Sequence, residues 1–522
     1  MKILLVSSGG KSIGLEYIFS YLKQRGHTVD FIYDPTMFYI PQEKKGRFAL
    51  HNRYCYSPII IEPLIREILK SQPDLIGFSV FSDTYGFACR IAKAVKKVLN
   101  VPIIFGGYHP SSVPEIVLAE DYIDYVCVGE GEEAMEELVT VLKDGGDTTA
   151  IPNIWTKQEG QLIKNPPRPL IKDLDVLPFP GDICSYKRYS QFIDAYLIIT
   201  SRGCPFDCTF CYNHLEHRMY RGKEGSFRRR SVDNVMEELK LVKKQNKGIK
   251  NIWFGDAIFT YDTKWLKEFC LKYKREIGLP YMCFSYAPYI SSEVMELLES
   301  SNCVIVELGI QTVSEEIRKE ILKRYDTNQQ IIAAINLFQS SKVSLVVNIL
   351  LNVPGQDEQE LVNTARFFSQ YPPDSISLLP LRYYPRTDII EKAREKGILS
   401  QEDVKKIEHS KEYTPFGVGH ILSSKQMIEN NKIYRDRKLA NLVGISYTIP
   451  FFLMNIVLKN KLYLYLLLML NVYAILIQVG RSLVKRKRKF KFFNFWREIR
   501  FYFWRHRARF PHIMANIEDR KE

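Results

Sequence analysis

The sequence predicts an α/β protein with a doubly wound parallel sheet, a partial (β/α)6 barrel and a helical C-terminal region. Three observations lead to this expectation. Residues 1–145 alternate short apolar runs with amphipathic helical patterns, which is typical of an open parallel sheet with helices on both faces. Residues 196–395 repeat a strand-then-helix unit six times, as a barrel does. Residues 396–522 carry long apolar runs and a basic tail.

The bulk composition sets the class and the compartment. The chain has 522 residues, which suggests two to four domains, and 46% of them are hydrophobic, enough for large cores. Its ten cysteines do not make a disulfide scaffold, so we expect a reducing, cytoplasmic location. Residues 1–6 are too short an apolar run for a secretory signal and are typical of a first β-strand instead.

The net charge of +14 is concentrated in one tail. Between Arg481 and Arg509 there are 12 Lys and Arg against one acid, and residues 510–522 carry a net −1, which leaves +4 for residues 1–480. Because the excess charge belongs to the tail, the body of the chain lacks the basic pattern of a nucleic-acid-binding protein. We do not expect nucleic acid to be a partner.

The first 145 residues predict a flavodoxin- or Rossmann-like sheet. Expected strands are 2–7, 28–32, 75–79, 103–105 and 125–128, and expected helices are 14–25, 59–70, 85–99 and 134–143. Ligands of such sheets lie at the carboxyl ends of the strands, where glycines let a backbone approach a broad, flat ligand. The residues at those ends are Ser8, Gly9, Gly10, Ser79, Val80, Gly106, Gly107, Tyr108, His109, Gly129, Glu130 and Gly131.

A connector and a barrel follow. Six prolines between Pro152 and Pro180 interrupt regular structure in residues 146–195. Expected barrel strands are 195–200, 251–254, 282–285, 304–308, 345–350 and 375–379, and expected helices are 231–245, 262–277, 292–300, 314–323, 328–340 and 358–369. Barrel enzymes place their chemistry at the carboxyl ends of the strands.

Three cysteines follow the first barrel strand. Cys204, Cys208 and Cys211 have CxxxCxxC spacing, so their thiolates can close a compact loop over a soft metal centre. A cluster of four irons normally takes four thiolates, and three leave one iron open for chemistry. The alternatives are a structural zinc site, with His214 as a fourth ligand, or three reduced thiols.

This loop resembles that of the radical S-adenosylmethionine (SAM) enzymes, in which the three cysteines would hold a [4Fe–4S] cluster. Phe210 fits the family's aromatic residue before the third cysteine. The N-terminal loops resemble the cobalamin-binding domain that precedes many radical SAM barrels. The Asp-x-His-x-x-Gly motif of other cobalamin proteins is absent, so we expect His109 to form hydrogen bonds and not to ligate cobalt.

The resemblance also implies SAM contacts at the ends of the barrel strands. Asp256 would meet the amino group of SAM, although an Asx cap is the alternative. Gln311 would meet the ribose, and Asn348 and Pro354 the adenine. Many cobalamin-dependent relatives carry an arginine after the third strand, where this chain has Tyr286. For the carboxylate of SAM, Arg382 and Arg386 are the candidate substitutes.

The C-terminal region predicts either a membrane contact or a helical cap. Residues 462–479 are an uncharged run, and residues 439–458 are nearly as apolar but contain Pro450. Basic flanks and an aromatic, basic tail at 490–510 suit a hairpin or an interfacial helix at the cytoplasmic face of a membrane. The alternative is that the apolar runs pack on the barrel. Membrane contact is therefore expected, if at all, within 439–510.

By resemblance, the chain is a cobalamin-dependent methyltransferase that acts on an unactivated carbon of a hydrophobic or lipid substrate. An external electron donor such as flavodoxin or ferredoxin is implied. The alternatives are a cobalamin-dependent radical SAM cyclase or rearrangement enzyme, and a non-catalytic, membrane-tethered metal-binding protein. A methylthiotransferase would need cluster cysteines in its N-terminal domain, and the loop at residues 7–10 contains none.

Overall fold

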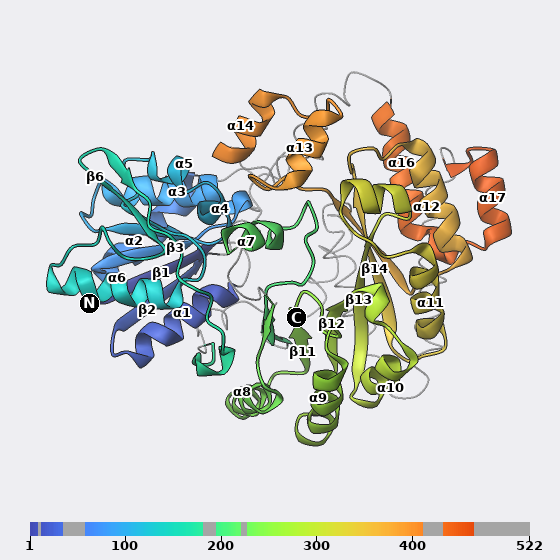
Figure 1. The fold of residues 1–522 in the computed structure, drawn as a ribbon, viewed down its shortest axis with the longest axis horizontal. Helices are drawn as coiled ribbons and strands as arrows, with labels where there is room; N and C mark the ends of the chain where they lie inside the picture. Colours follow the sequence, from blue (N-terminus) through green and yellow to red (C-terminus); the bar gives the residue numbers. More distant parts are fainter. Residues whose placement is uncertain (9–11, 35–57, 181–194, 221–226, 411–431, 464–522) are drawn as a thin grey trace, which may run out of the picture. The chain divides into compact units, whose positions relative to one another are not determined.

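The computed structural model describes residues 1–8, 12–34, 58–180, 195–220, 227–410 and 432–463. The chain divides into two compact units, Met1–Tyr465 and Leu466–Glu522. Figure 1 draws these described residues as a coloured ribbon, and all of them belong to the first unit.

The N-terminal domain is a doubly wound sheet with the strand order β2-β1-β3-β4-β5-β6-β7. The first five strands are parallel. They are β1 (Lys2–Ser8), β2 (Thr28–Asp34), β3 (Leu75–Ser79), β4 (Ile103–Gly106) and β5 (Tyr125–Cys127). The helices are α1 (Ile13–Gln24), α2 (Pro58–Ser71), α3 (Ser82–Lys96), α4 (Tyr108–Ser112), α5 (Pro114–Leu118) and α6 (Glu132–Asp144).

Side-chain alternation along the strands builds a core on each face of this sheet. Leu4 and Val6 of β1 pack in one core with residues of α2 and α3. Ile3 and Leu5 point the other way, into a second core with α1 and α6. Each core is a hydrophobic layer between the sheet and the helices on that face. The doubly wound fold expected from the sequence is confirmed.

An antiparallel hairpin inside the expected connector extends the sheet. β6 (Ile154–Gln158) pairs with β5, and β7 (Gln161–Ile163) pairs with β6. Glu159 and Gly160 form the turn with φ of 51° and 79°, and two positive φ values are what a tight two-residue hairpin requires. The surrounding prolines made this segment look irregular. The Glu-Gly pair between two alternating runs is the signal that could have revealed it.

The second sheet is parallel throughout, with the order β15-β14-β13-β12-β11-β8. Its strands are β8 (Ala195–Ile198), β11 (Asn251–Phe254), β12 (Tyr281–Ser285), β13 (Cys303–Gln311), β14 (Ser344–Leu351) and β15 (Ser375–Pro380). The helices after these strands include α8 (Val232–Gln245), α9 (Thr263–Glu276), α10 (Ser292–Ser300), α11 (Asn328–Gln339), α12 (Glu358–Gln370), α13 (Asp388–Glu395) and α14 (Gln401–His409). This is the expected partial barrel.

Two small elements flank the cysteine loop. β9 (Ser201–Arg202) and β10 (Arg228–Arg229) pair antiparallel, with Arg202 opposite Arg228. The helix α7 (Asn213–Met219) follows the third cysteine. The loop therefore begins at a short hairpin and ends at a helix.

The helix expected at 314–323 has a different geometry, which corrects that expectation. Residues Ile317–Ile321 form a π-helical turn, η7. The Arg318 side chain is fully buried beneath it and donates to the carbonyl oxygens of Thr312 at 2.5 Å and Asp326 at 3.1 Å. The buried guanidinium thus satisfies its donors on the backbone that flanks this turn.

The first apolar run of the C-terminal region packs on the barrel. It forms α16 (Lys432–Ile445) and α17 (Phe451–Lys459), separated at Pro450, and both contact α12. Leu439, Leu442 and Val443 are fully buried. For residues 439–458 the packed arrangement is the one found. Residues 464–479 and the tail at 490–510 lie outside the described part of the chain. Within that described part, no helix combines the length and the apolar character needed to cross a bilayer.

Candidate active site

The cysteine loop lies at the carboxyl edge of the barrel sheet. Cys204, Cys208 and Cys211 are free thiols, and Cys208 is buried while the other two are half-buried. Burial raises the pKa of the Cys204 thiol to about 12 and raises the pKa of Cys208 and Cys211. Such thiols become thiolates when a metal ion compensates their charge. The three thiols and their partial exposure thus suit a cluster that the protein ligates on one side.

Partners in distant elements hold the loop. Thr209 donates through its backbone N–H to the Leu322 carbonyl at 3.2 Å, and through its hydroxyl to the Ile321 carbonyl at 2.7 Å. Its own carbonyl accepts from the backbone N–H of Ile389 in α13 at 3.1 Å. The His217 ring, on α7, lies 2.7 Å from the carbonyl oxygen of Cys204. The π-helical turn, α13 and α7 therefore set the shape of the loop.

His214 is directed away from the cysteines. It is buried, with Nδ1 against a carboxylate oxygen of Asp207 and Nε2 at 3.1 Å from a carboxylate oxygen of Asp388. Both ring nitrogens face carboxylates, so His214 does not serve as a fourth ligand here. Within the described ranges, no three His, Cys, Asp or Glu side chains converge closely enough to hold a single metal ion.

Asp256 follows β11 and binds the start of the cysteine loop. Its Oδ1 accepts from the backbone N–H of Thr200 at 3.0 Å, from the Thr200 hydroxyl at 2.9 Å and from the Ser201 hydroxyl. These bonds connect two strands and do not cap the next turn, so the Asx-cap alternative does not describe this residue. Its Oδ2 is buried and has no hydrogen-bond partner among the described residues.

Of the other expected SAM contacts, Gln311 and Pro354 lie at this edge of the sheet, whereas Asn348 lies within β14, opposite Gly309. Gln311 ends β13 with φ of 73°, and its side chain crosses Gly309, where an added Cβ would lie 2.6 Å from Gln311 Nε2. On the neighbouring strand, Asn348 donates to Glu307 at 3.2 Å. Pro354 is buried in the turn after β14. The half-buried Phe210 packs on an apolar cluster that includes residues of η7 and of the end of β14.

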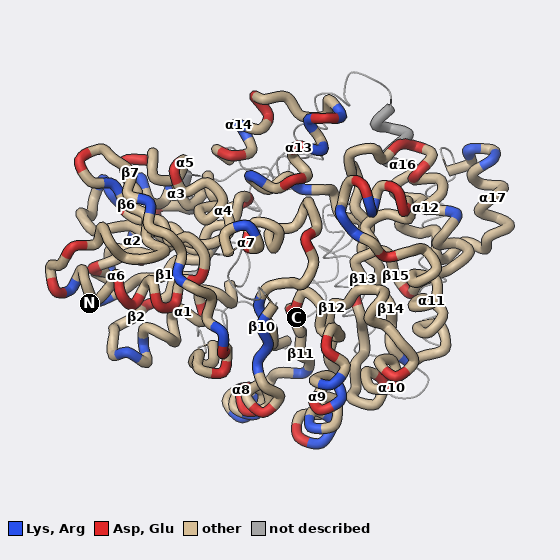
Figure 2. Tube along the Cα trace, in the orientation of Figure 1, with Lys and Arg blue, Asp and Glu red and all other residues tan. Residues whose placement is uncertain are grey.

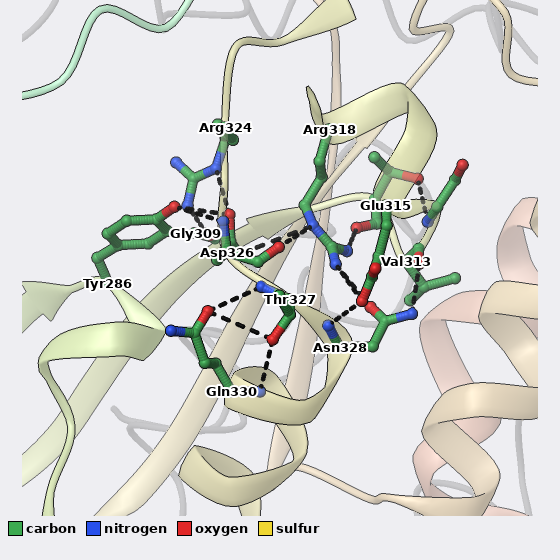
Figure 3. A network of polar contacts seen from close by, with 12 residues as sticks. Tyr286, Gly309, Val313, Glu315, Arg318, Arg324, Asp326, Thr327, Asn328 and Gln330 are labelled. Atoms are coloured by element: carbon green, nitrogen blue, oxygen red, sulfur yellow. Dashed lines mark hydrogen bonds and ion pairs between the residues drawn. The ribbon is translucent and has the colours of Figure 1, made fainter. Parts of the chain in front are cut away.

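The sequence reasoning missed Arg324. Its guanidinium donates to the Gly309 carbonyl at 2.5 Å and lies 4.3 Å from the ring centre of Tyr286. Burial lowers the pKa of Arg324, but the charge of the nearby Cys208 and other groups outweighs burial and raises that pKa. The Tyr286 hydroxyl in turn donates to Asp326 at 2.7 Å. Figure 3 shows Arg324, Tyr286 and Asp326 directed toward one another. Arg324 belongs to no motif that could be recognised in the sequence. It reaches the cysteine loop only through the folding of η7.

The two arginines expected to replace a third-strand arginine are engaged elsewhere. Arg382 pairs with Asp83, and Arg386 pairs with Glu115 and lies 3.5 Å from Glu408. Asp83 and Glu115 belong to the N-terminal domain. These pairs correct the suggestion that either arginine is directed at SAM, and Arg324 is the arginine beside the cysteine loop.

The carboxyl edge of the N-terminal sheet has the geometry of a cofactor site. Chain connections leave β1 and β3 toward opposite faces, which is the switch point where such sheets bind ligands. Ser12, at the start of α1, and Ser79, at the end of β3, lie there with hydroxyl oxygens 3.1 Å apart. Ser8 ends β1. Gly9 and Gly10 lie outside the described residues.

The loop after β4 contacts its own domain and the barrel. Gly107 has φ of 102°, and an added Cβ would lie 2.9 Å from the carbonyl oxygen of Val80. The rings of Tyr108 and Tyr212, the residue after Cys211, stack with centroids 3.8 Å apart. His109 is fully buried, with Nδ1 at 3.1 Å from the Ser82 hydroxyl. His109 Nδ1 thus pairs with Ser82 inside the domain, whereas Nε2 is buried without a hydrogen-bond partner among the described residues.

The loop after β5 is occupied by protein contacts. An added Cβ at Gly129 would lie 2.1 Å from the Tyr220 hydroxyl, and one at Gly131 would lie 2.9 Å from Ile18. Glu130 accepts hydrogen bonds from Arg202 and Arg228 of the barrel. These three residues were expected to approach cobalamin, but the small size of the glycines and the charge of Glu130 serve contacts between parts of the chain.

A three-cysteine loop at the edge of a parallel barrel sheet, behind a doubly wound domain, defines a radical SAM enzyme with a cobalamin-binding domain. Residues 198–368 match the radical SAM superfamily, and residues 2–139 match the B12 binding domain. The chain belongs to the family of cobalamin-binding radical SAM enzymes, whose cofactors are a [4Fe–4S] cluster, SAM and cobalamin.

Known relatives agree with this assignment. The chain is 30% identical over 337 residues to the uncharacterized methyltransferase PH0819 of Pyrococcus horikoshii, covering 64% of this chain and 72% of that protein. It is 23% identical over 359 residues to the anaerobic magnesium-protoporphyrin IX monomethyl ester cyclase of Synechocystis, covering 67% and 70%. The cobalamin-dependent radical enzyme OxsB shares the fold, with a TM-score of 0.62 at 18% identity, covering 91% of this chain and 72% of OxsB.

We predict that Cys208→Ala abolishes SAM cleavage and lowers the iron bound after anaerobic reconstitution. Removing one of three thiolates leaves too few ligands for a cluster with one open iron. Cys270→Ala, which alters a buried cysteine in α9, is the matched control and should retain both properties. Continued formation of 5′-deoxyadenosine by Cys208→Ala would contradict the assignment.

A second prediction concerns the pH dependence of stability. Burial lowers the pKa of His109 to about 3, whereas a histidine in an unfolded chain has a pKa of about 6.5. The contribution of neutral His109 to the free energy of unfolding is therefore complete above about pH 6.5. It is lost as the pH falls toward 3, because only the unfolded chain binds the proton. Below about pH 6 the unfolding free energy of the wild type should fall more steeply than that of His109→Gln, by about 1.4 kcal/mol per pH unit. Urea unfolding of the apo protein at pH 7.5 and 5.5 measures this difference, and parallel slopes would mean that His109 is solvated.

Proposed function

We propose that this enzyme is a cobalamin-dependent methyltransferase that acts on an unactivated carbon of a hydrophobic substrate. The observation that carries the proposal is the stacking of Tyr108 on Tyr212, with centroids 3.8 Å apart. Tyr108 follows β4 at the cofactor edge of the N-terminal sheet, and Tyr212 follows the third cysteine. A methyl carrier and a radical source must act on the same carbon, and this contact joins the two loops that belong to them.

The protein's part in this reaction is to bind, orient and exclude water. When bound, the cluster and SAM supply a carbon-centred radical, and cobalamin supplies a methyl group. Cys204, Cys208 and Cys211 would hold three irons. Gln311, at the end of β13, and Asn348, within the adjacent strand β14, would contact the ribose and the adenine, with Pro354 beside the adenine. Asp256 has a buried oxygen free of hydrogen bonds in the described structure, which supports a role toward the amino group of SAM.

Aromatic side chains beside the cysteine loop support a hydrophobic substrate. Phe206, inside the loop, has its ring centre 4.9 Å from that of Tyr286 and 6.1 Å from that of Tyr289. Tyr289 continues the row to Tyr261 at 5.2 Å, and Tyr261 to Phe227 at 4.8 Å. Edge-to-face rings offer an apolar surface with a few polar tips, which suits a molecule without many charges. The electron donor would be an external protein such as flavodoxin or ferredoxin.

A cyclase or rearrangement activity is the second candidate, because the Synechocystis relative is named as a cyclase. The two activities differ in the mass of the product. We predict that anaerobic incubation with SAM, cobalamin and a reductant adds about 14 Da per turnover to a compound in a hydrophobic extract, as methyl transfer requires. SAM labelled with deuterium in its methyl group should add the label to the same compound. A product of unchanged or lower mass would favour the cyclase.

Membrane contact through 439–510 remains a prediction. In α17, Phe452 and Ile456 are 65% and 48% exposed, and Phe451 and Leu453 are also exposed. We expect the full chain to float with vesicles that contain an anionic lipid and less with neutral ones, because the tail is basic. The double change Phe452→Glu and Ile456→Glu should reduce flotation without destabilising the core. Flotation that depends neither on the lipid charge nor on this double substitution would contradict the prediction.

A further inference from the structure

Glu130 accepts hydrogen bonds from three segments of the chain. Its Oε1 lies 2.9 Å from an Nη1 of Arg202 and 2.9 Å from Nη1 of Arg228. Its Oε2 accepts from the backbone N–H of Ile171 at 2.9 Å. The side chains of Glu130, Arg202 and Arg228 are 17%, 15% and 7% exposed, so the charges are largely shielded from water. Burial raises the pKa of Glu130, but the two guanidinium groups outweigh it and hold that pKa below its ordinary value.

The arginines belong to the hairpin that starts the cysteine loop. Arg202 is on β9 and Arg228 lies opposite it on β10. Figure 2 shows β10 as a blue, basic segment. Only Gly203, with φ of 77°, separates Arg202 from Cys204. The position of Arg202 therefore constrains the first cluster ligand.

Further contacts fix Arg202 in one geometry. Its second terminal nitrogen lies 2.5 Å from Glu132, the buried first residue of α6, which follows this loop. Its guanidinium also lies 4.9 Å from the ring centre of Tyr17 on α1. A planar guanidinium that uses two nitrogens for two carboxylates has little rotational freedom. The Gly129–Tyr220 approach holds the other side of the loop, since Tyr220 follows α7.

Both ends of the cysteine loop are thus attached to the cofactor edge of the N-terminal sheet. Arg202, before the first cysteine, is held by the loop after β5. Tyr212, after the third cysteine, is stacked on Tyr108 in the loop after β4. Buried ion pairs contribute little net stability but can specify one arrangement. The Tyr108–Tyr212 stack is a second attachment, at the other end of the same loop. Together the two attachments indicate that the ion pairs specify how the carboxyl edge of the N-terminal sheet lies against the cysteine loop.

We propose that Glu130 is a positioning residue that, through Arg202 and Arg228, holds the loop after β5 in register with Cys204, and so sets the placement of the cobalamin edge against the cluster. The proposal rests on the proposed function for its consequence, which is coupling of SAM cleavage to methyl transfer. The close approach of Tyr220 to Gly129, which has φ of 86°, holds the same loop at the residue before Glu130.

The test compares Glu130→Gln with Glu137→Gln in the full chain. Both changes remove one acidic charge, but Glu137 pairs with Arg168 away from the cysteine loop. In the apo protein, amide hydrogen exchange should be faster in Glu130→Gln at residues 129–132 and 200–204 and unchanged in Glu137→Gln. Glu130→Asp, which keeps the charge, should lie between the wild type and Glu130→Gln and serves if Glu130→Gln does not fold.

A second readout uses the reconstituted protein, reduced with dithionite in the presence of hydroxocobalamin. The magnetic coupling between the reduced cluster and cobalt(II) reports their separation, and Glu130→Gln should broaden the distance distribution. The number of SAM molecules cleaved per methyl transferred should rise by about tenfold or more, since a misplacement of about 1 Å can cost about 100-fold.

The outcomes separate this proposal from the proposed function. Unchanged exchange and an unchanged distance distribution in Glu130→Gln would overturn the positioning role, whatever the enzyme's reaction. Altered exchange and distance in an enzyme that transfers no methyl group would support the positioning role and overturn the methyltransferase assignment. A general loss of stability, with faster exchange throughout both domains, would also count against the proposal.

Discussion

A loop without regular secondary structure must satisfy its polar groups outside itself, and the arrangement around the cysteines follows from this constraint. The loop from Gly203 to Tyr212 forms hydrogen bonds with elements that are distant in the sequence. Thr209 uses both its backbone and its hydroxyl on η7 and also binds α13. The π-helical turn is thus more than a local irregularity, because its last carbonyl groups point to the loop and not along a continuing helix. Arg318, buried within this turn, donates to carbonyl groups on either side of it, those of Thr312 and Asp326.

Buried charge is concentrated where the parts of the molecule meet. Arg202 and Arg228 meet Glu130 between the N-terminal loop and the cysteine hairpin, and Arg324 meets Asp326 beside Cys208. Removing one member of a buried pair typically costs about 3–5 kcal/mol, because the other charge is left without compensation, although the intact pair adds little net stability. Such pairs penalise a wrong arrangement more than they reward the right one. That property suits an enzyme in which two cofactor sites must meet in one geometry.

Apolar packing sets the limits of the barrel. The sheet is covered by α8 to α12, with a dense aromatic core around Phe254, Phe269 and Tyr281. α16 then packs against α12 and β15, and an added Cβ at Gly444 would lie 3.2 Å from Leu378 of β15. The same apolar character that suggested a membrane helix at 439–458 is used to cover the barrel, because hydropathy does not distinguish lipid from a protein core. Part of this apolar surface, on the exposed face of α17, is not buried.

The sequence by itself determined the fold class and the positions of most strands, and it predicts the three cysteines as cluster ligands. Apolar periodicity and the spacing of Cys204, Cys208 and Cys211 are local properties, and local patterns survive folding. The strand pattern also indicated that Gln311 ends β13, whereas Asn348 lies within β14 and not at its carboxyl end. Only the tertiary structure decided that Arg324 lies by the cysteines and that Glu130 meets Arg202. These contacts join residues 72 or more positions apart, or residues brought together by an irregular turn. No periodic pattern records such pairings, since they depend on how separate elements pack.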